Sequence, residues 1–374
     1  MRGGMQHWPL VVTSFIDHAA REHGEREIVG YWADGTVERS NWAAIHFESR
    51  RLAQVLLRLG IAKGDRVATL AMNHISHETC WYGIAGMGGV MHTVNPRLFD
   101  EQIVYIINHA QDRVLLFDYQ FLPIVERLRD RLPTIERFIL FDGPETPNYL
   151  HLKSLLSEEN GEFTWADCDE RDPCGLCYTS GTTGNPKGVL YQHRSNVLHA
   201  LAEIQPDSLC LSSRSVVLPV VPMFHANGWG VAYAAAAVGA KLVLSATNDA
   251  ETLWRLIREE GVTHSAGVPT VWLSLFTHMD ENGGDFGSLK RAVIGGSAAP
   301  RSMIERLETA GVEVQHVWGM TETSPIGTVG TRPANWDALS TSDKVDHIGR
   351  QGSVCWGVEL RIVDDEDKPL PRDG

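Results

Sequence analysis

The chain has 374 residues, well above the roughly 150 residues of a typical single domain. Hydrophobic residues make up 43% of it and charged residues 21%, which provides for a large core and excludes wholesale disorder. The 33 Lys and Arg against 47 Asp and Glu give a formal net charge of −14, the wrong sign for a protein whose main partner is a nucleic acid. A local phosphate site is still compatible with this charge, since a few backbone N–H groups and one Lys suffice.

Neither a transmembrane segment nor a disulfide framework is predicted. The longest apolar candidate, Val231–Val238, is far shorter than the roughly 18 residues of a membrane span, and Met1–Leu10 lacks the apolar core of a signal peptide. Cys174 and Cys177 form a C-x-x-C spacing. Because there is no second pair and the segment has the pattern of a buried strand, we expect neither redox chemistry nor zinc there. The scattered cysteines indicate a reducing compartment, so we expect a cytoplasmic protein.

Short β-branched runs alternate with helix-length segments along the chain. Strands are predicted at Arg66–Met72, Val114–Asp118, Arg137–Phe141, Cys174–Tyr178, Val216–Val221, Lys241–Ser245, Arg291–Gly295 and Val312–Trp318. Helices are predicted at Ser76–Gly88, Glu101–Ala110, Leu122–Arg131, Asn196–Glu203, Glu251–Glu260 and Pro300–Ala310. The alternation is typical of doubly wound parallel sheets, so the expected fold class is α/β, with ligand sites at the carboxyl ends of strands.

The most informative stretch is Tyr178-Thr-Ser-Gly-Thr-Thr-Gly-Asn-Pro-Lys-Gly188, which follows a predicted strand and precedes a helix opening near His193. Glycines let the backbone approach a phosphate closely, hydroxyls and N–H groups donate hydrogen bonds, and a Lys supplies charge. The Walker pattern is not met, because Pro186 stands where it requires Gly, and Gly188 where it requires Ser or Thr. The stretch therefore predicts a phosphate-binding loop of another kind. The alternative without a function is an ordinary flexible turn.

These residues resemble the phosphate-binding signature of the adenylate-forming superfamily, which includes acyl-CoA synthetases, luciferases and the adenylation domains of peptide synthetases. Four further segments match in the family's order: Thr93-Val-Asn-Pro-Arg97, Val221-Pro-Met-Phe-His-Ala-Asn-Gly-Trp229, Gly295-Gly-Ser-Ala-Ala-Pro300 and Val317-Trp-Gly-Met-Thr-Glu-Thr-Ser-Pro325. The chain is most similar to medium- and long-chain fatty acyl-CoA synthetases. The resemblance implies a large N-terminal domain built of two doubly wound βαβ layers.

The resemblance implies ATP- and Mg²⁺-dependent activation of a fatty acid through an acyl-adenylate to its coenzyme A thioester. The implied ATP-binding residues are Thr179, Ser180, Gly181, Thr182, Thr183, Gly184, Lys187, Gly296, Ser297, Ala298, His316, Val317, Trp318, Gly319, Met320 and Thr321. The first seven would hold the β- and γ-phosphates, Thr321 would touch the α-phosphate, and Trp318 would stack on the adenine. Ser180, Thr182 and Glu322 would support Mg²⁺, a hard cation that takes oxygen ligands. The implied catalytic residues are Lys187, Thr182, Glu322 and His225.

The acyl pocket is expected around His225, Ala226, Trp229, Val268 and Gly295. A lone His is often a core or capping residue, but the motif context favours His225 as a gate between the acyl pocket and the adenylate. Apolar side chains at regular spacing belong to the core more often than to a pocket, so Trp229 and Val268 are candidates for either.

Several other functions remain as alternatives. Gly295-Gly-Ser-Ala-Ala299 approaches the nucleophile elbow of α/β-hydrolases, but Ala299 breaks the pattern, and Asp346 and His347 are poorly placed as relay partners. A peptide-synthetase adenylation domain is disfavoured, because Val216–Val221 and the residues after it offer no Asp for an ammonium group. A ligase for an aryl or short-chain acid, and a non-catalytic nucleotide- or acyl-adenylate-binding protein, both stay open.

The domain organisation follows from the same resemblance. We expect an AMP-binding N-terminal domain over residues 1–356, with subdomains of about 1–165 and 166–356, because the polar stretch Asp142–Glu170 is the best candidate boundary. Residues 357–374 would begin a truncated β-rich subdomain with a turn at Asp364–Asp367. No Thr-Gly-Asp motif for the ribose and no late catalytic Lys occur in the sequence, so we expect the small C-terminal domain to be absent and turnover by this chain to be low. Some relatives pair through the large domain, which makes a homodimer a candidate assembly.

Overall fold

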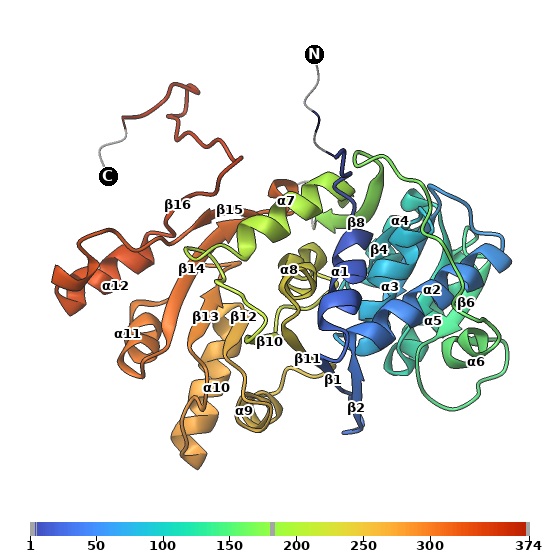
Figure 1. The fold of residues 1–374 in the computed structure, drawn as a ribbon, viewed down its shortest axis with the longest axis horizontal. Helices are drawn as coiled ribbons and strands as arrows, with labels where there is room; N and C mark the ends of the chain where they lie inside the picture. Colours follow the sequence, from blue (N-terminus) through green and yellow to red (C-terminus); the bar gives the residue numbers. More distant parts are fainter. Residues whose placement is uncertain (1–3, 5, 180–183, 372–374) are drawn as a thin grey trace.

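The computed structural model describes residue 4, residues 6–179 and residues 184–371. Within these residues two sheets lie side by side, with helices between them and on their outer faces (Figure 1). The seven-stranded sheet has the order β7 (Leu150–His151), β6 (Arg137–Leu140), β5 (Asp112–Phe117), β3 (Arg66–Leu70), β4 (Val90–Thr93), β8 (Pro173–Thr179), β9 (Lys187–Gln192). The nine-stranded sheet has the order β16 (Ser353–Val354), β15 (Ile326–Val329), β14 (Glu313–Gly319), β13 (Arg291–Ile294), β12 (His264–Gly267), β10 (Val216–Pro219), β11 (Lys241–Ser245), β1 (Glu27–Tyr31), β2 (Val37–Asn41).

The expected α/β class is confirmed, since the inner strands of both sheets pair in parallel and antiparallel pairs occur only toward the edges. The helices are α1 (Thr13–His23), α2 (Trp42–Arg58), α3 (Ile75–Gly86), α4 (Asp100–Ala110), α5 (Leu122–Leu128), α6 (Leu152–Ser157), α7 (His193–Glu203), α8 (Val231–Val238), α9 (Ala250–Glu259), α10 (Pro269–Asn282), α11 (Arg301–Thr309) and α12 (Thr341–Gly349). Short 3-10 turns are η1 (Tyr119–Phe121), η2 (Arg129–Arg131), η3 (Ala226–Gly230), η4 (Thr321–Thr323) and η5 (Trp336–Ala338).

The core is divided into layers by the sheets. Helices α1, α2, α3 and α8 fill the space between the two sheets with a cluster that includes Trp42, Trp81 and Tyr233. A second cluster packs α9 to α12 on the outer face of the nine-stranded sheet, and a third packs α4 and α5 on the outer face of the other. Because both sheets are covered on both faces, their inner strands are nearly continuous apolar runs.

Each of the two sheets takes strands from both sides of residue 165, near which the subdomain boundary was expected. Strands β1 and β2 cross into the nine-stranded sheet, where β1 pairs with β11, and β8 and β9 belong to the seven-stranded sheet through β4. The chain therefore passes between the sheets more than once. In the C-terminal segment Val363 and Pro369 form an isolated bridge around the turn expected at Asp364–Asp367. No helix within the described part of the chain is long and apolar enough to cross a membrane.

An ionic cluster around the buried Glu260 links β11, β1 and β2, three neighbouring strands of the nine-stranded sheet. Glu260, just after α9, accepts hydrogen bonds of 2.8 Å from Tyr31 Oη, Arg39 Nη2 and Lys241 Nζ, which lie on β1, β2 and β11. Burial alone would raise the pKa of Glu260, but the hydrogen bonds from Arg39, Lys241 and Tyr31 outweigh it and lower the pKa to about 2. The carboxylate is therefore an anchor that holds these three strands together.

Glu260→Gln should lower the free energy of unfolding by roughly 2–3 kcal/mol at pH 7. Because the folded pKa is depressed, the contribution of Glu260 is fully present above its unfolded value and is lost as the pH falls from about 4.5 toward about 2. Urea unfolding at pH 7 and pH 3.5 checks this, and the difference between variant and wild type should shrink at the lower pH. The control is Glu101→Gln, at an exposed site where Glu101 Oε1 lies 3.8 Å from Arg131 Nη1. If both substitutions lowered the free energy of unfolding equally, the role of the cluster would be contradicted.

Candidate active site

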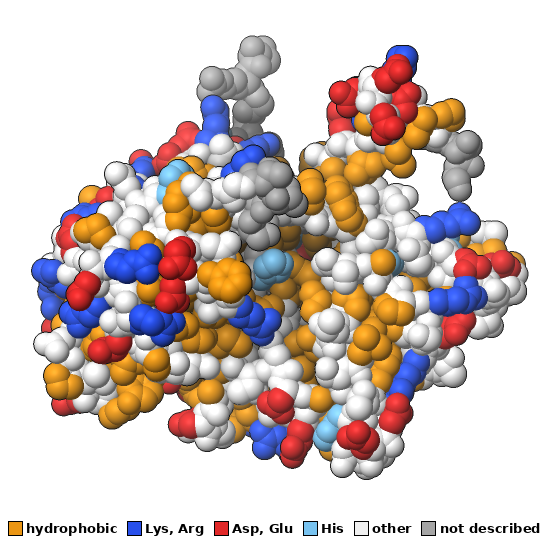
Figure 2. Space-filling model, turned by 180° about the vertical axis from the view of Figure 1, so that it is seen from behind, with side chains coloured by type: hydrophobic (Ala, Val, Ile, Leu, Met, Phe, Trp, Pro, Cys, Tyr) orange, Lys and Arg blue, Asp and Glu red, His pale blue; other side chains and the backbone are white. Residues whose placement is uncertain are grey.

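A cavity of about 580 Å³ opens where the two sheets meet, and Figure 2 shows the surface hollowed there, between the two halves of the molecule. It lies at the carboxyl ends of β4, β8, β13 and β14, as expected for an α/β fold. Its lining residues are Thr93, Asn95, Leu98, Ile106, Tyr178, Thr179, Pro186, Lys187, Phe224, His225, Ala226, Trp229, Gly296, Val317, Trp318, Gly319, Met320, Thr321, Glu322, Pro325 and Ile326. The lining combines charged and hydroxyl side chains with the aromatic rings of Tyr178, Phe224, Trp229 and Trp318.

The β8–β9 hairpin carries the polar residues of the predicted phosphate loop. Thr179 and Lys187 are directly opposite each other in its antiparallel register, and Thr179 Oγ1 donates to the Lys187 carbonyl oxygen at 3.5 Å. Gly184 adopts a φ of +105°, which a residue with a Cβ adopts only with strain. Ser180, Gly181, Thr182 and Thr183 lie outside the described residues. The hairpin thus places an ammonium group and a hydroxyl at the mouth of the cavity.

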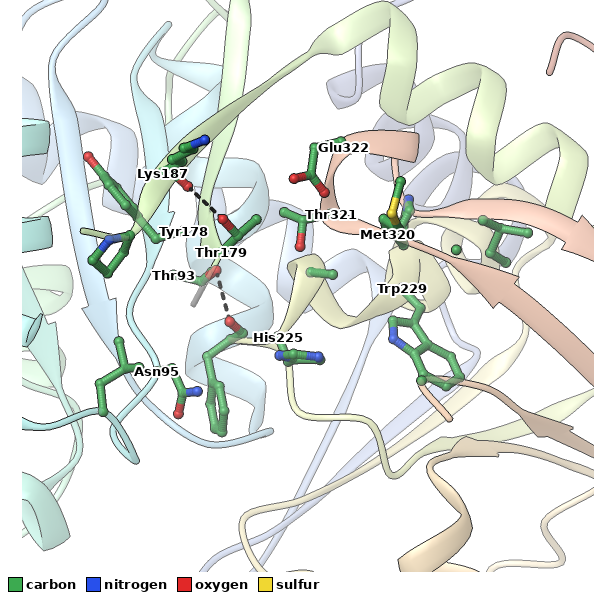
Figure 3. Close-up of a pocket in the computed structure, with 18 of the residues that line it drawn as sticks. Thr93, Asn95, Tyr178, Thr179, Lys187, His225, Trp229, Met320, Thr321 and Glu322 are labelled. Atoms are coloured by element: carbon green, nitrogen blue, oxygen red, sulfur yellow. Dashed lines mark hydrogen bonds between the residues drawn. The ribbon is translucent and has the colours of Figure 1, made fainter. Parts of the chain in front are cut away.

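The turn η4 brings Thr321 and Glu322 to the same mouth from the other sheet. Figure 3 shows the Glu322 carboxylate and the Lys187 side chain on facing sides of the cleft, with Thr321 between Glu322 and the cavity floor. Tyr191, on β9, donates from its buried hydroxyl to the Thr321 carbonyl oxygen at 2.6 Å. Desolvation raises the pKa of this phenol, so it remains a hydrogen-bond donor at neutral pH. This bond fixes the turn carrying Glu322 to the strand carrying Lys187.

Tyr191→Phe should weaken binding of magnesium–ATP about three- to tenfold, because the loss of one buried hydrogen bond costs about 1 kcal/mol and lets η4 drift from β9. Calorimetric titration measures the effect. Tyr149→Phe is a matched control, since its hydroxyl donates to Glu126 Oε1 at 2.8 Å away from the cavity. Unchanged affinity in Tyr191→Phe would show that the bond does not position the turn.

The chemistry of the lining fits Mg²⁺. No group of three or more His, Cys, Asp or Glu side chains that could hold a metal occurs among the residues described, so a site made entirely of protein ligands is not formed there. Glu322 is the carboxylate of the lining. One or two carboxylates together with substrate phosphates and water are the usual ligands of Mg²⁺ in nucleotide sites.

On the side expected to hold adenine, Gly296, Val317, Trp318, Gly319 and Met320 line the cavity. The half-buried Trp318 ring packs so closely on the next strand that a Cβ at Gly327 would lie 2.7 Å from it. Ser297, Ala298 and His316 do not line the cavity.

His316 instead lies buried behind the loop Gly295–Pro300. Its Nε2 accepts from the Ala299 N–H at 3.2 Å, and its Nδ1 donates to the Ile348 carbonyl oxygen at 3.0 Å. Desolvation lowers the pKa of His316, which is consistent with a neutral ring acting as donor on one nitrogen and acceptor on the other. His316 therefore supports the loop from the side away from the cavity.

The residues of the expected acyl pocket gather around Trp229. A Cβ built at Gly295 would lie 3.2 Å from the Trp229 ring, and one built at Gly296 would lie 3.1 Å from Val268 Cγ1 and 3.8 Å from the same ring. His225 and Ala226 line the cavity beside them, whereas Gly295 and Val268 lie behind its surface. Desolvation, with the nearby charge of Arg97, lowers the pKa of His225, so its ring is neutral near pH 7.

The segment that carries these residues has unusual backbone geometry. Ala226, Asn227, Gly228, Trp229 and Gly230 all have positive φ, from 40° to 73°. The left-handed conformation costs about 1–2 kcal/mol for a residue with a Cβ, and three residues of this turn carry one. Asn73, three residues after β3, holds the backbone that precedes this turn: it donates to the Pro219 and Val221 carbonyl oxygens at 3.0 Å and accepts from the Met223 N–H at 2.7 Å.

Several lining residues carry no predicted role. Thr93, Asn95, Tyr178, Pro186, Phe224 and Pro325 stand within the quoted motifs, so membership of a motif was a usable signal for them. Leu98, Ile106 and Ile326 reach the cavity through the packing of the fold. Leu98 and Ile106 follow an ordinary apolar pattern in and before α4, which sequence alone does not distinguish from core.

Comparison with known proteins gives consistent results. The model of the AMP-binding enzyme family matches residues 16–374. Over 382 aligned residues the chain is 47% identical to the medium-chain-fatty-acid–CoA ligase of Ectopseudomonas oleovorans, with coverage of 100% of this chain and 70% of that protein. It is also 47% identical to the 3-methylmercaptopropionyl-CoA ligase of Ruegeria pomeroyi, with coverage of 100% and 71%. The crystal structure of the anthranilate CoA ligase AuaEII in complex with anthranoyl-AMP matches with a TM-score of 0.86 at 23% identity, over 99% of this chain and 68% of that one, which shows a common fold.

Proposed function

The chain belongs to the AMP-binding enzyme family, and from this membership and the cavity we propose that it binds ATP, Mg²⁺ and a medium- or long-chain fatty acid for conversion to the coenzyme A thioester. The observation that carries the proposal is the division of the cavity. Figure 3 shows Lys187, Thr179 and Glu322 toward one end of the cavity, and Trp229 away from them. A phosphate chain and an apolar acyl chain require this pairing of surfaces.

The first step joins the fatty-acid carboxylate to the α-phosphorus of ATP and breaks the bond to pyrophosphate. Lys187 places positive charge where the leaving pyrophosphate accumulates negative charge, and Thr179, with Thr182, would donate hydrogen bonds to the same oxygens. Thr321 would contact the α-phosphate at the reaction centre. Mg²⁺, when bound, supplies further charge neutralisation, and Glu322, with Ser180 and Thr182, would hold it.

In the second step the coenzyme A thiolate attacks the acyl carbonyl carbon, and AMP leaves. The neutral His225 ring would separate the acyl chain from the adenylate phosphate and allow the carbonyl to be approached from the cavity mouth. The Trp318 indole would stack on the adenine, because flat aromatic rings attract each other in an offset-stacked arrangement.

The activity of the 374-residue chain by itself is a separate part of the proposal. We propose that this chain binds nucleotide and acyl-adenylate at the cavity between the two sheets.

A short-chain acid is the second candidate substrate, because one of the two relatives at 47% identity is named for a ligase of 3-methylmercaptopropionate. Thioester formation with magnesium–ATP and coenzyme A, compared for octanoate, palmitate, 3-methylmercaptopropionate and benzoate, separates the candidates. The proposal expects product formation that is fastest with the fatty acids. If product forms faster with 3-methylmercaptopropionate or with benzoate, that acid and not a fatty acid is the preferred substrate. Binding of nucleotide with no acid-dependent product would indicate a non-catalytic binding protein.

A further inference from the structure

Asn227 stands at the centre of the left-handed turn and is bound by the opposite sheet. Its Oδ1 accepts from Thr93 Oγ1 at 2.9 Å and from Cys177 Sγ at 2.7 Å, and its backbone N–H donates to Cys177 Sγ at 3.2 Å. Thr93 ends β4 and Cys177 lies on β8, both in the seven-stranded sheet, whereas the turn follows β10 of the nine-stranded sheet. All three side chains are buried, so these hydrogen bonds do not compete with bulk water.

Local sequence preference does not explain the shape of the turn, because consecutive left-handed residues do not form a stable helix in an L-polypeptide. The turn is also tightly packed. A Cβ at Gly228 would lie 3.2 Å from Met223 Cα and 3.5 Å from the Trp81 ring on α3. Tertiary contacts must therefore hold the conformation, and the bonds of Asn227 are side-chain contacts that reach the turn from the other sheet.

We propose that Asn227 is a positioning residue: bound to Thr93 and Cys177, it holds the left-handed turn that presses Trp229 against Gly295 and Gly296 and so sets the shape of the acyl pocket. This rests on the proposed function. The Trp229 ring and Asn227 are two residues apart on the same turn, so rotation of the turn moves the ring. Release of the bonds would let Ala226, Asn227 and Trp229 relax toward ordinary φ values and withdraw the ring from the two glycines.

Thr93→Val tests the proposal, because valine has the shape of threonine without the hydroxyl donor. Asn227→Ala is less useful, since it removes the shared acceptor of two buried donors, Thr93 and Cys177, at once and puts folding itself at risk. Thr93→Ser is the rescue, as it restores the donor. Thr79→Val is the matched control: it removes a buried hydroxyl whose hydrogen bond, to the Ile75 carbonyl oxygen, lies within α3.

Each variant is titrated by calorimetry with two adenylate mimics, adenosine 5′-sulfamate without an acyl group and its dodecanoyl derivative. Thr93→Val should weaken the dodecanoyl mimic about tenfold more than the acyl-free mimic, as the loss of one buried hydrogen bond allows. Thr93→Ser and Thr79→Val should stay within about twofold of wild type for the ratio of the two affinities. Equal weakening of both mimics, or no change in the ratio, would overturn the proposal.

A second measurement needs no ligand and so separates this proposal from the proposed function. The chain is labelled with 5-fluorotryptophan, and the Trp229 signal is assigned by its loss in Trp229→Phe. In Thr93→Val this ¹⁹F signal should shift or broaden, while it should coincide with wild type in Thr93→Ser and Thr79→Val. An unchanged signal in Thr93→Val would show that the bonds do not hold the turn. If the wild type binds neither mimic but the signal moves, the proposed function fails and the role of Asn227 in holding the turn stands.

Discussion

Lys187→Ala should weaken the binding of magnesium–ATP about 10- to 100-fold while changing the affinity for an acyl-adenylate mimic by less than about threefold. Charge-assisted hydrogen bonds contribute about 1.5–3 kcal/mol, and Lys187, opposite Thr179 on the β8–β9 hairpin, is expected to make them with the β- and γ-phosphates. The mimic carries no pyrophosphate, so it makes no such bond at this position. Calorimetric titration of both ligands measures the two affinities on the same protein sample.

The control for this prediction is Lys153→Ala, on the exposed side of α6 and outside the cavity lining. It should leave both affinities at the wild-type value, because screened surface charges act weakly over such a distance. An equal loss for magnesium–ATP and for the mimic in Lys187→Ala would mean that Lys187 contacts the α-phosphate or supports the fold. No loss for either ligand would remove the hairpin from the phosphate site.

Gly319→Ala should destabilise the protein by about 3 kcal/mol or more and reduce the binding of both ligands by more than about tenfold. A Cβ at Gly319 would lie 1.9 Å from the Pro325 carbonyl oxygen, the atom that accepts from the Met320 N–H at 3.0 Å. Because the clash is with backbone, the end of β14 must shift. Trp318, Met320 and the turn η4 would shift with it. Thermal unfolding and calorimetric binding measure the two effects.

Gly349→Ala is the matched control for this substitution. Gly349 ends α12 without a positive φ, and a Cβ at this position would meet no heavy atom within 4 Å. Alanine in place of a helical glycine should therefore be neutral or stabilising by up to about 1 kcal/mol. A Gly319→Ala protein that melts and binds like wild type would show that β14 and η4 are not held as closely as the structure indicates.

Local patterns in the sequence predict much of the sheet framework. β11 has the predicted bounds Lys241–Ser245, β13 is predicted within one residue, and α7 begins at His193. The two strands are short apolar runs that lie in the buried middle of a sheet, so their sequence carries a strong signal. Strand β9 (Lys187–Gln192) is not predicted, because it is an edge strand with mostly exposed side chains and a glycine.

The pairing between distant segments is the part that the sequence does not specify. β1 lies beside β11 although more than 200 residues separate them. Nothing in the sequence of either strand indicates which strand it pairs with. The same limit applies to the site: the motifs give Lys187 and Glu322, but the bond from Tyr191 to Thr321 joins two motifs through the fold. The left-handed turn around Asn227 is also invisible locally, since only two of its five residues are glycines and tertiary contacts determine the rest.

The most direct test of the account is calorimetric binding of non-hydrolysable acyl-adenylate mimics with acyl chains of two to sixteen carbons. If the crevice between the two sheets holds both adenylate and acyl chain, affinity should rise with chain length, by up to about fourfold for each buried methylene, until the pocket is filled. Glu322→Ala serves as a companion variant, since its carboxylate should matter for magnesium–ATP more than for these mimics. A folded chain with cooperative melting that binds none of the mimics, or binds all lengths equally, would contradict the central claim.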